Sequence, residues 1–240
     1  MAVAKTKRLD GIFRQIGYSK WVFARAFLPS LKILIPLAIF SFAFTTTMSL
    51  SLDGSIVVIA LVLFILFSFY AAIVTMYIID SVYRREKIDF KKLLPTSRKN
   101  FWKFFIVKFL TALIIIIGYL LFIIPGIFLS VRYAFTGFVA LFEKKSIGDT
   151  MDYGFELTHG YWWALFGRFV ILGFLISVLY VLIISALLYV GSLLAPITST
   201  INSGIILNAI TSFVSPFVGL WITSFYYVLY RDIAKKSVTI

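Results

Sequence analysis

The chain contains no cysteine and only one histidine. Without cysteine there is no disulfide, no zinc–thiolate site and no thiol nucleophile. The single histidine, His159, excludes a paired-histidine metal motif, and the sequence also lacks a GxSxG nucleophile elbow, a Walker loop and a GxGxxG loop. We therefore expect a protein that is not an enzyme and that holds no cofactor and no metal.

Acidic residues are scarce, whereas hydrophobic residues are more abundant than in a soluble domain. The 10 Asp and Glu face 23 Lys and Arg, which gives a net charge of +13, and 61% of the residues are hydrophobic. Soluble domains are nearer about 45–50% apolar. The basic residues flank apolar runs, and no nucleic-acid-binding module is recognised, so nucleic acid is not an expected partner. Membrane lipids with anionic headgroups are the expected partners.

Five runs are almost free of charge and long enough to cross a bilayer, which needs roughly 20 apolar residues. The third run contains Pro125-Gly126, which is better suited to a turn than to a helix interior. Splitting it there predicts an all-α integral membrane bundle of six transmembrane helices in one domain, residues 1–240. The predicted spans are 28–50, 55–79, 101–124, 127–142, 163–190 and 205–230.

The distribution of charge predicts the orientation of these spans. Asp53 is the only charge between the first two spans, and the connection between the last two has none. Basic residues gather in the N-terminal segment and after the second span, where they include Arg84, Arg85, Lys91, Lys92, Arg98 and Lys99. Because basic segments stay in the cytoplasm, both termini are expected there.

Three segments on the basic side have the pattern of short interfacial amphipathic helices, at residues 8–22, 88–100 and 146–159. The third begins with Ser146 and Asp149 at the spacing of a capping box. Two interpretations remain open for all three segments. They anchor the ends of the spans, or they form a specific site for lipid headgroups.

Arg132 is the one clearly intramembrane ionisable residue, and it is therefore a candidate site. On the six-span prediction it lies about 8 Å below the outer end of its helix. There it either reaches headgroup phosphates or pairs with an acid such as Asp53. Glu156 and His159 share one face of a predicted helix at the opposite membrane face, roughly 15 Å or more from Arg132.

The stretch from Ile123 to Phe169 resembles a bacterial membrane family that includes YciC-type inner-membrane proteins and the membrane domain found beside glycerophosphodiester phosphodiesterases. His159 departs mildly from the family pattern, in which a basic residue is common at this position. The resemblance implies a six-span layout in a bacterial inner membrane and no catalytic domain. It rests on Pro125, Gly126, Arg132, Tyr133, Glu156, Leu157, Thr158, Gly160 and Trp163.

These observations favour a non-enzymatic, lipid-associated membrane protein that supports envelope maintenance by binding anionic lipid or a membrane protein partner, including a second copy of itself. The alternative is a small transporter or channel with a polar cavity. A membrane-embedded lipid enzyme is the third possibility, and it would require Arg132, Glu156 and His159 to converge. The predicted lining of the transport cavity is Ser68, Ser177, Ser185, Thr211, Ser212 and Ser215.

Overall fold

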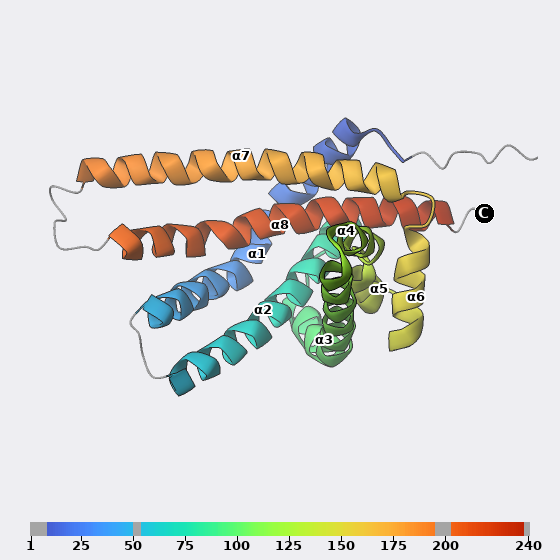
Figure 1. Ribbon diagram of the computed structural model, residues 1–240, viewed down its shortest axis with the longest axis horizontal. Helices are drawn as coiled ribbons and strands as arrows, with labels where there is room; N and C mark the ends of the chain where they lie inside the picture. The colour runs from blue at the N-terminus through green and yellow to red at the C-terminus, as the bar shows by residue number, and fades with distance from the viewer. Residues whose placement is uncertain (1–8, 50–53, 195–202, 238–240) are drawn as a thin grey trace, which may run out of the picture.

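The computed structural model describes residues 9–49, 54–194 and 203–237, and this part of the chain folds into α-helices without a strand (Figure 1). The helices in chain order are α1 (Ile12–Ser49), α2 (Gly54–Tyr83), α3 (Phe90–Leu121), α4 (Ile123–Arg132), α5 (Thr136–Phe142), α6 (Ile147–Leu157), α7 (Trp162–Leu194) and α8 (Ser203–Ser237).

Six stretches within the described residues are long and apolar enough to span a membrane. The helices α1, α2, α3, α7 and α8 each contain one, and α4 and α5 together form the sixth, Ile123–Phe142. The prediction of an all-α bundle with six membrane-length helices is therefore confirmed. These helices indicate a multi-pass membrane protein.

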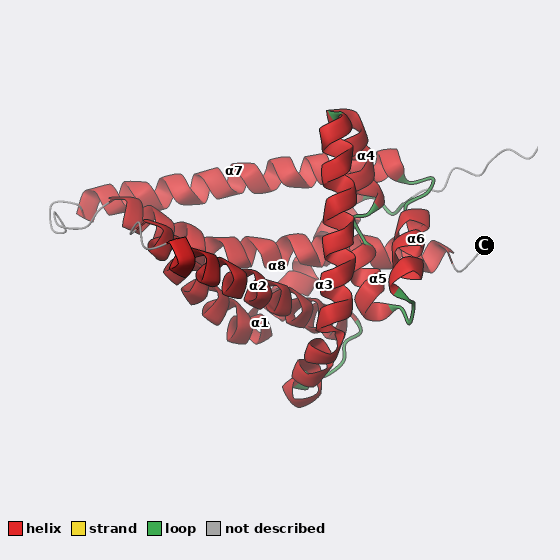
Figure 2. Ribbon diagram, turned by 60° about the horizontal axis from the view of Figure 1, so that its bottom comes forward, coloured by secondary structure: helices red, strands yellow, loops and turns green. Residues whose placement is uncertain are grey.

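Four of the long helices, α1, α2, α7 and α8, extend lengthwise, whereas α3 crosses their direction steeply and forms a hairpin with α4 (Figure 2). The short helices α5 and α6 lie near the C-terminal end of α8 (Figure 1). Residues at the start of α1 are hydrogen-bonded to the end of α8. We call this end of the molecule, formed by the start of α1 and the ends of α2 and α8, the basic end.

The turn between α3 and α4 falls at Phe122, which is extended (φ −164°, ψ 158°), three residues before the predicted split at Pro125. Pro125 is instead the third residue of α4, where its missing N–H costs no intrahelical hydrogen bond. Gly118 and Gly126 let the two helices approach closely. A Cβ atom placed on Gly126 would lie 2.4 Å from the ring of Tyr119.

Two of the three predicted interfacial helices are not separate elements. Residues 12–22 are the first part of α1, and residues 90–100 are the first part of α3. The prediction was wrong because nothing between these segments and the following spans ends a helix. Pro29, Pro36 and Pro95 lie inside helices that continue past them. Each proline removes one backbone hydrogen bond, and this loss does not end the helix. The third segment is a separate helix, α6, and Ser146 caps it by accepting a hydrogen bond from the Asp149 N–H (3.2 Å).

The core beside the basic end is aromatic. Phe135 and Phe138 pack on Tyr230 of α8, and Phe138 also packs on Tyr227. All four side chains are buried. Both tyrosine hydroxyls donate to carboxylates, Tyr227 to Asp80 of α2 and Tyr230 to Glu143 (2.9 Å) after α5. Because buried polar groups need partners, these two pairs fix α2, α5 and α8 relative to one another.

Candidate anion-binding cleft

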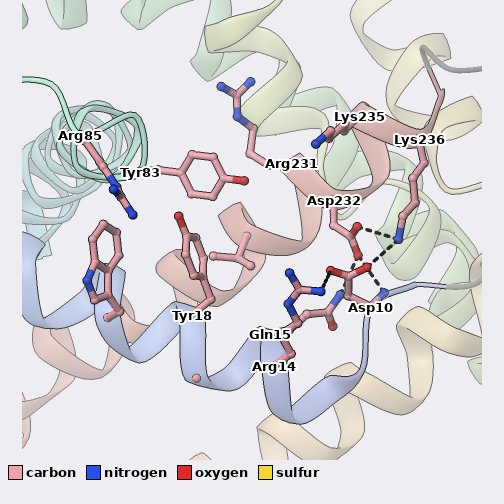
Figure 3. Close-up of a pocket in the computed structure, with 13 residues that line it drawn as sticks. Asp10, Arg14, Gln15, Tyr18, Tyr83, Arg85, Arg231, Asp232, Lys235 and Lys236 are labelled. Carbon is pink, nitrogen blue, oxygen red and sulfur yellow. Dashed lines mark hydrogen bonds and ion pairs between the residues drawn. The ribbon is translucent and has the colours of Figure 1, made fainter.

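A cleft of about 670 Å³ opens at the basic end between α1, α2 and α8 (Figure 3). Its lining combines five cationic side chains, two carboxylates and three large aromatic side chains. The charged groups therefore carry a net charge of +3. The lining residues used below are Asp10, Arg14, Gln15, Tyr18, Trp21, Tyr83, Arg85, Arg231, Asp232, Lys235 and Lys236.

One wall of the cleft is held by Asp232 of α8. Its carboxylate accepts hydrogen bonds from the Asp10 N–H (3.2 Å) and from Nε2 of Gln15 (2.9 Å). Lys236 bridges the two acids, with its Nζ 2.8 Å from Asp232 and 3.1 Å from Asp10 (Figure 3). Nη1 of Arg14 lies 3.5 Å from the Asp10 carboxylate. Arg14 and Lys236 together balance the two carboxylates, so this wall is structural.

Arg168 of α7 ties a third helix to the same wall. Its guanidinium donates to Oε1 of Gln15 (2.7 Å), to the Asp10 carbonyl (2.8 Å) and to the Ala164 carbonyl (2.8 Å). Gln15 is almost fully buried. This buried side chain is therefore donor to Asp232 and acceptor from Arg168, and it joins α1, α7 and α8.

The opposite wall carries cations that lie over aromatic rings. The guanidinium of Arg85 is 5.7 Å from the ring of Trp21, and that of Arg231 is 5.6 Å from the ring of Tyr83. Tyr18 packs edge-on against Tyr83 and completes the floor. A guanidinium over a ring keeps its N–H donors available at the edge of the plane, where an anion can bind bidentately.

Arg85 has a backbone conformation that is unusual for its residue type. Its φ of 60° is the only positive φ of a non-glycine residue in the described part of the chain. This left-handed conformation costs a non-glycine residue about 1–2 kcal/mol, and such outliers gather at functional sites. Here the conformation ends α2 and directs an arginine to the rim of the cleft (Figure 3).

Arg84, the neighbouring residue, is engaged elsewhere. Its Nε lies 2.9 Å from Asp80, which raises the pKa of the Arg84 guanidinium. Arg231 is farther from the same carboxylate, at 3.8 Å. Asp80 therefore neutralises Arg84 more strongly than Arg231.

The structure separates the six basic residues that the sequence proposed together. Arg85 lines the cleft, and Arg84 is paired with Asp80 beside it. The remaining four are exposed on the first turns of α3 and do not line the cleft: Lys91, Lys92, Arg98 and Lys99. Sequence reasoning missed Arg14, Arg231 and Lys235 as site residues. The sequence offered one indication that these residues could share a site, because their segments were all expected on the same side of the membrane.

Arg132 is not where the sequence placed it. It is the last residue of α4, ten residues from the hairpin turn, and it is buried under α6 with its guanidinium 3.7 Å from the ring of Phe155. Its carbonyl accepts a hydrogen bond from the Thr158 hydroxyl (3.1 Å), and its charge interacts with Glu156. The predicted separation of Arg132 and Glu156 was therefore wrong, because α4 ends at Arg132 and α6 packs against that end. Asp53 lies outside the described residues.

The other motif residues surround this point. Tyr133 packs on Phe155, and Gly160 has a φ of 82° in the turn between α6 and α7, where only glycine fits without strain. Trp163 is 78% exposed. The side chain of His159 is exposed beside Glu156, and the backbone N–H of His159 donates to the Glu156 carbonyl (2.8 Å).

The residues predicted to line a transport cavity do not meet at the basic cleft or at a second, apolar cavity. The cavity between α1, α7 and α8, about 560 Å³, is lined by hydrocarbon side chains and Lys20. Ser212 is buried beside Thr45 (3.4 Å between hydroxyls), and Ser177, Ser185 and Ser215 are exposed. Neither this cavity nor the basic cleft includes any of the predicted lining residues Ser68, Ser177, Ser185, Thr211, Ser212 and Ser215.

Within the described ranges, no group of three or more His, Asp or Glu side chains lies close enough together to hold a metal ion. The arrangement at the basic end places positive charge beside aromatic surface, which is suited to binding an anion. Comparisons of the chain with protein-family models, with curated proteins and with solved structures give no match.

Proposed function

We propose that this protein is a non-enzymatic membrane protein that binds anionic phospholipid headgroups in the cleft at its basic end. The observation that carries the proposal is the wall formed by Arg85 and Arg231, whose guanidinium groups lie over Trp21 and Tyr83. Lys235 adds positive charge around the same opening. A headgroup phosphate in the cleft would meet arginine donors from two helices.

The surroundings of the cleft favour a lipid over a soluble anion. Tyr and Trp side chains prefer the membrane interface, and Tyr18, Trp21 and Tyr83 form the floor between the charged groups. The cleft lies at the ends of membrane-length helices. A phosphate held there would be at headgroup depth, with its acyl chains beside α1 and α2.

The same proposal includes the orientation and the setting. The basic end faces the cytoplasm of a bacterium, since Lys and Arg near span ends are retained on that side. The resemblance to YciC-type proteins supports a role in envelope maintenance. Membrane protein partners, including a second copy, remain part of the proposal because α7 exposes much of its apolar surface.

The test measures lipid retention by native mass spectrometry of the full chain in nanodiscs that contain equal amounts of phosphatidylglycerol and phosphatidylcholine. A hydrogen bond to a charged group contributes about 1.5–3 kcal/mol, and the two arginines of the cleft are placed to make such bonds with one phosphate. Replacing Arg85 and Arg231 with Gln should therefore reduce the preference for phosphatidylglycerol by about tenfold or more.

The matched control removes the same charge from an exposed surface, with Arg98→Gln and Lys99→Gln on α3. This control should change the preference for phosphatidylglycerol by less than about threefold. Exposed charges are screened by solvent, and their side chains are not held in a fixed position for a headgroup. Equal losses in the two double variants would mean that general surface charge, not the cleft, selects the lipid. That result would refute the site.

Arg85→Gly provides a second, independent readout. Glycine adopts the left-handed conformation without strain, so this variant should be at least as resistant to unfolding as the wild type. It should nevertheless retain less phosphatidylglycerol. If Arg85→Gly retains as much phosphatidylglycerol as the wild type, lipid binding does not explain the left-handed conformation of Arg85.

A further inference from the structure

Arg132 is a buried cation with an unsatisfied side-chain donor. The residue is only 5% exposed, and its Nε finds no partner among the described residues. The guanidinium lies 3.7 Å from the Phe155 ring and 5.8 Å from the Phe128 ring. These rings offer cation–π attraction, but they do not take the in-plane N–H donors.

An arrangement of this kind is costly unless an acceptor is supplied. Buried polar groups nearly always have partners, and an exception calls for an ion, water or ligand. Within the described part of the chain, Glu156 is the one carboxylate that contributes to the electrostatics of Arg132, and it is itself exposed. The guanidinium therefore has a donor that a ligand oxyanion could accept from.

The surface over Arg132 is aromatic and partly exposed, as expected at headgroup depth. Phe128 is 42% exposed and stacks on Trp162, and Trp163 is 78% exposed. Nε1 of Trp162 donates to the Phe128 carbonyl (3.3 Å), which fixes the indole against the end of α4. Indole rings at this depth favour contact with lipid headgroups.

The charge beside this site differs in sign from the charge at the basic cleft. All the charged side chains of α6 are acidic, namely Asp149, Asp152 and Glu156. All three are exposed, and Glu156 is the one that interacts with Arg132. A ligand that pairs its anion with Arg132 consequently meets a carboxylate next to it, which favours a cation on the same ligand.

We infer that Arg132 and Glu156 form a second lipid site that binds a zwitterionic phospholipid headgroup. The phosphodiester pairs with the Arg132 guanidinium, and the primary ammonium pairs with Glu156, which describes a phosphatidylethanolamine. The rings of Phe128 and Phe155 shift to admit the phosphate. This site uses α4 and α6, not the helices that form the basic cleft, and it does not depend on the anionic-lipid proposal.

The test compares two lipids that share the phosphodiester but differ in the ammonium. Because phosphatidylmethanol is anionic and would also bind in the basic cleft, the full chain carries Arg85→Gln and Arg231→Gln. This background in phosphatidylcholine nanodiscs receives either phosphatidylethanolamine or phosphatidylmethanol, and native mass spectrometry reports the retained lipid. It should retain phosphatidylethanolamine roughly two- to fivefold better, the range expected for an exposed ion pair. Glu156→Gln should abolish this preference, while Asp152→Asn, an equal change of charge on the same helix, should preserve it.

Arg132 is tested in the same assay. Arg132→Gln should lower the retention of both lipids by about tenfold, and Arg132→Lys by less, because lysine keeps the charge but lacks the planar fork. Glu156 is exposed, so its variant tests the site even if Arg132→Gln fails to fold. Unchanged ethanolamine preference in Glu156→Gln would overturn the proposal. Displacement of the lipid by inorganic phosphate at equal concentration would identify a free-phosphate site and would also overturn it.

Discussion

The hairpin of α3 and α4 provides the sharpest test of the packing, through Gly126→Ala. A Cβ atom at Gly126 would lie 2.4 Å from the Cγ and Cδ1 atoms of Tyr119. Ordinary contact begins at 3.4 Å, so the two helices or the Tyr119 ring must separate by about 1 Å. The ring atoms closest to the backbone are the ones that clash, and they have little freedom to move away.

The size of the effect follows from two opposing contributions. Overpacking of this kind costs typically about 1–3 kcal/mol. Replacing glycine by alanine in a helix returns up to about 1 kcal/mol of that cost. The net expectation is a loss of about 1–2 kcal/mol in the free energy of unfolding, measured by tryptophan fluorescence during titration of detergent micelles with dodecyl sulfate.

Two further variants make the measurement specific. Gly173→Ala in α7 meets no atom within 4 Å, so it should leave stability unchanged or raise it by up to about 1 kcal/mol. In a Tyr119→Ala background, adding Gly126→Ala should lower the free energy of unfolding much less than it does in the wild type. A double-mutant cycle between contacting residues measures this difference. The reasoning fails if Gly126→Ala is as stable as Gly173→Ala, because α3 and α4 would then not meet at this glycine.

Two other predictions concern the cap of α6 and the orientation of the chain. The Ser146 hydroxyl donates to Asp149 (2.6 Å) and lowers the pKa of that carboxyl from its ordinary 3.8. Because the native pKa is lowered, its contribution to stability is complete above 3.8 and is lost as the pH falls through the native value. Hydrogen exchange in α6 should accelerate there in the wild type but not in Ser146→Ala. Since the chain lacks cysteine, single cysteines report orientation: an impermeant thiol reagent on intact cells should label Gly54→Cys but not Lys144→Cys, and the reverse pattern would invert the topology.

The helices could be predicted from the sequence because hydrophobic length and local breaks determine them. The Pro125-Gly126 pair indicated that the third apolar run is two helices, and the turn lies three residues earlier, at Phe122. The error in position arises because proline is tolerated in the first turn of a helix and marks its start rather than the turn itself. The crossing of α3 over the lengthwise helices had no local signal, since it is set by packing between helices that meet only after folding.

The location of Arg132 shows where reasoning from single spans fails. Treating residues 127–142 as one straight helix placed Arg132 near the opposite membrane face from Glu156. The chain instead leaves the helix at Tyr133 and restarts it at Thr136, and Gly154 of α6 packs against that residue. A Cβ atom on Gly154 would lie 2.6 Å from the Thr136 methyl group. Close contact between these small residues brings α6 to the end of α4, and no spacing in the sequence indicates it.

The carboxylates explain why counting charges along the chain could not locate the cleft. Asp10, Asp80, Glu143 and Asp232 each bond to a residue more than 80 positions away. Three of them pair with particular cations. Asp10 pairs with Arg14 and Lys236, Asp232 pairs with Lys236, and Asp80 pairs mainly with Arg84. Arg231 lies farther from Asp80, at 3.8 Å, and it lines the cleft together with Arg85 and Tyr83 (Figure 3). Selectivity for an anionic headgroup therefore depends on which cations the acids hold most closely, and that is set by tertiary structure.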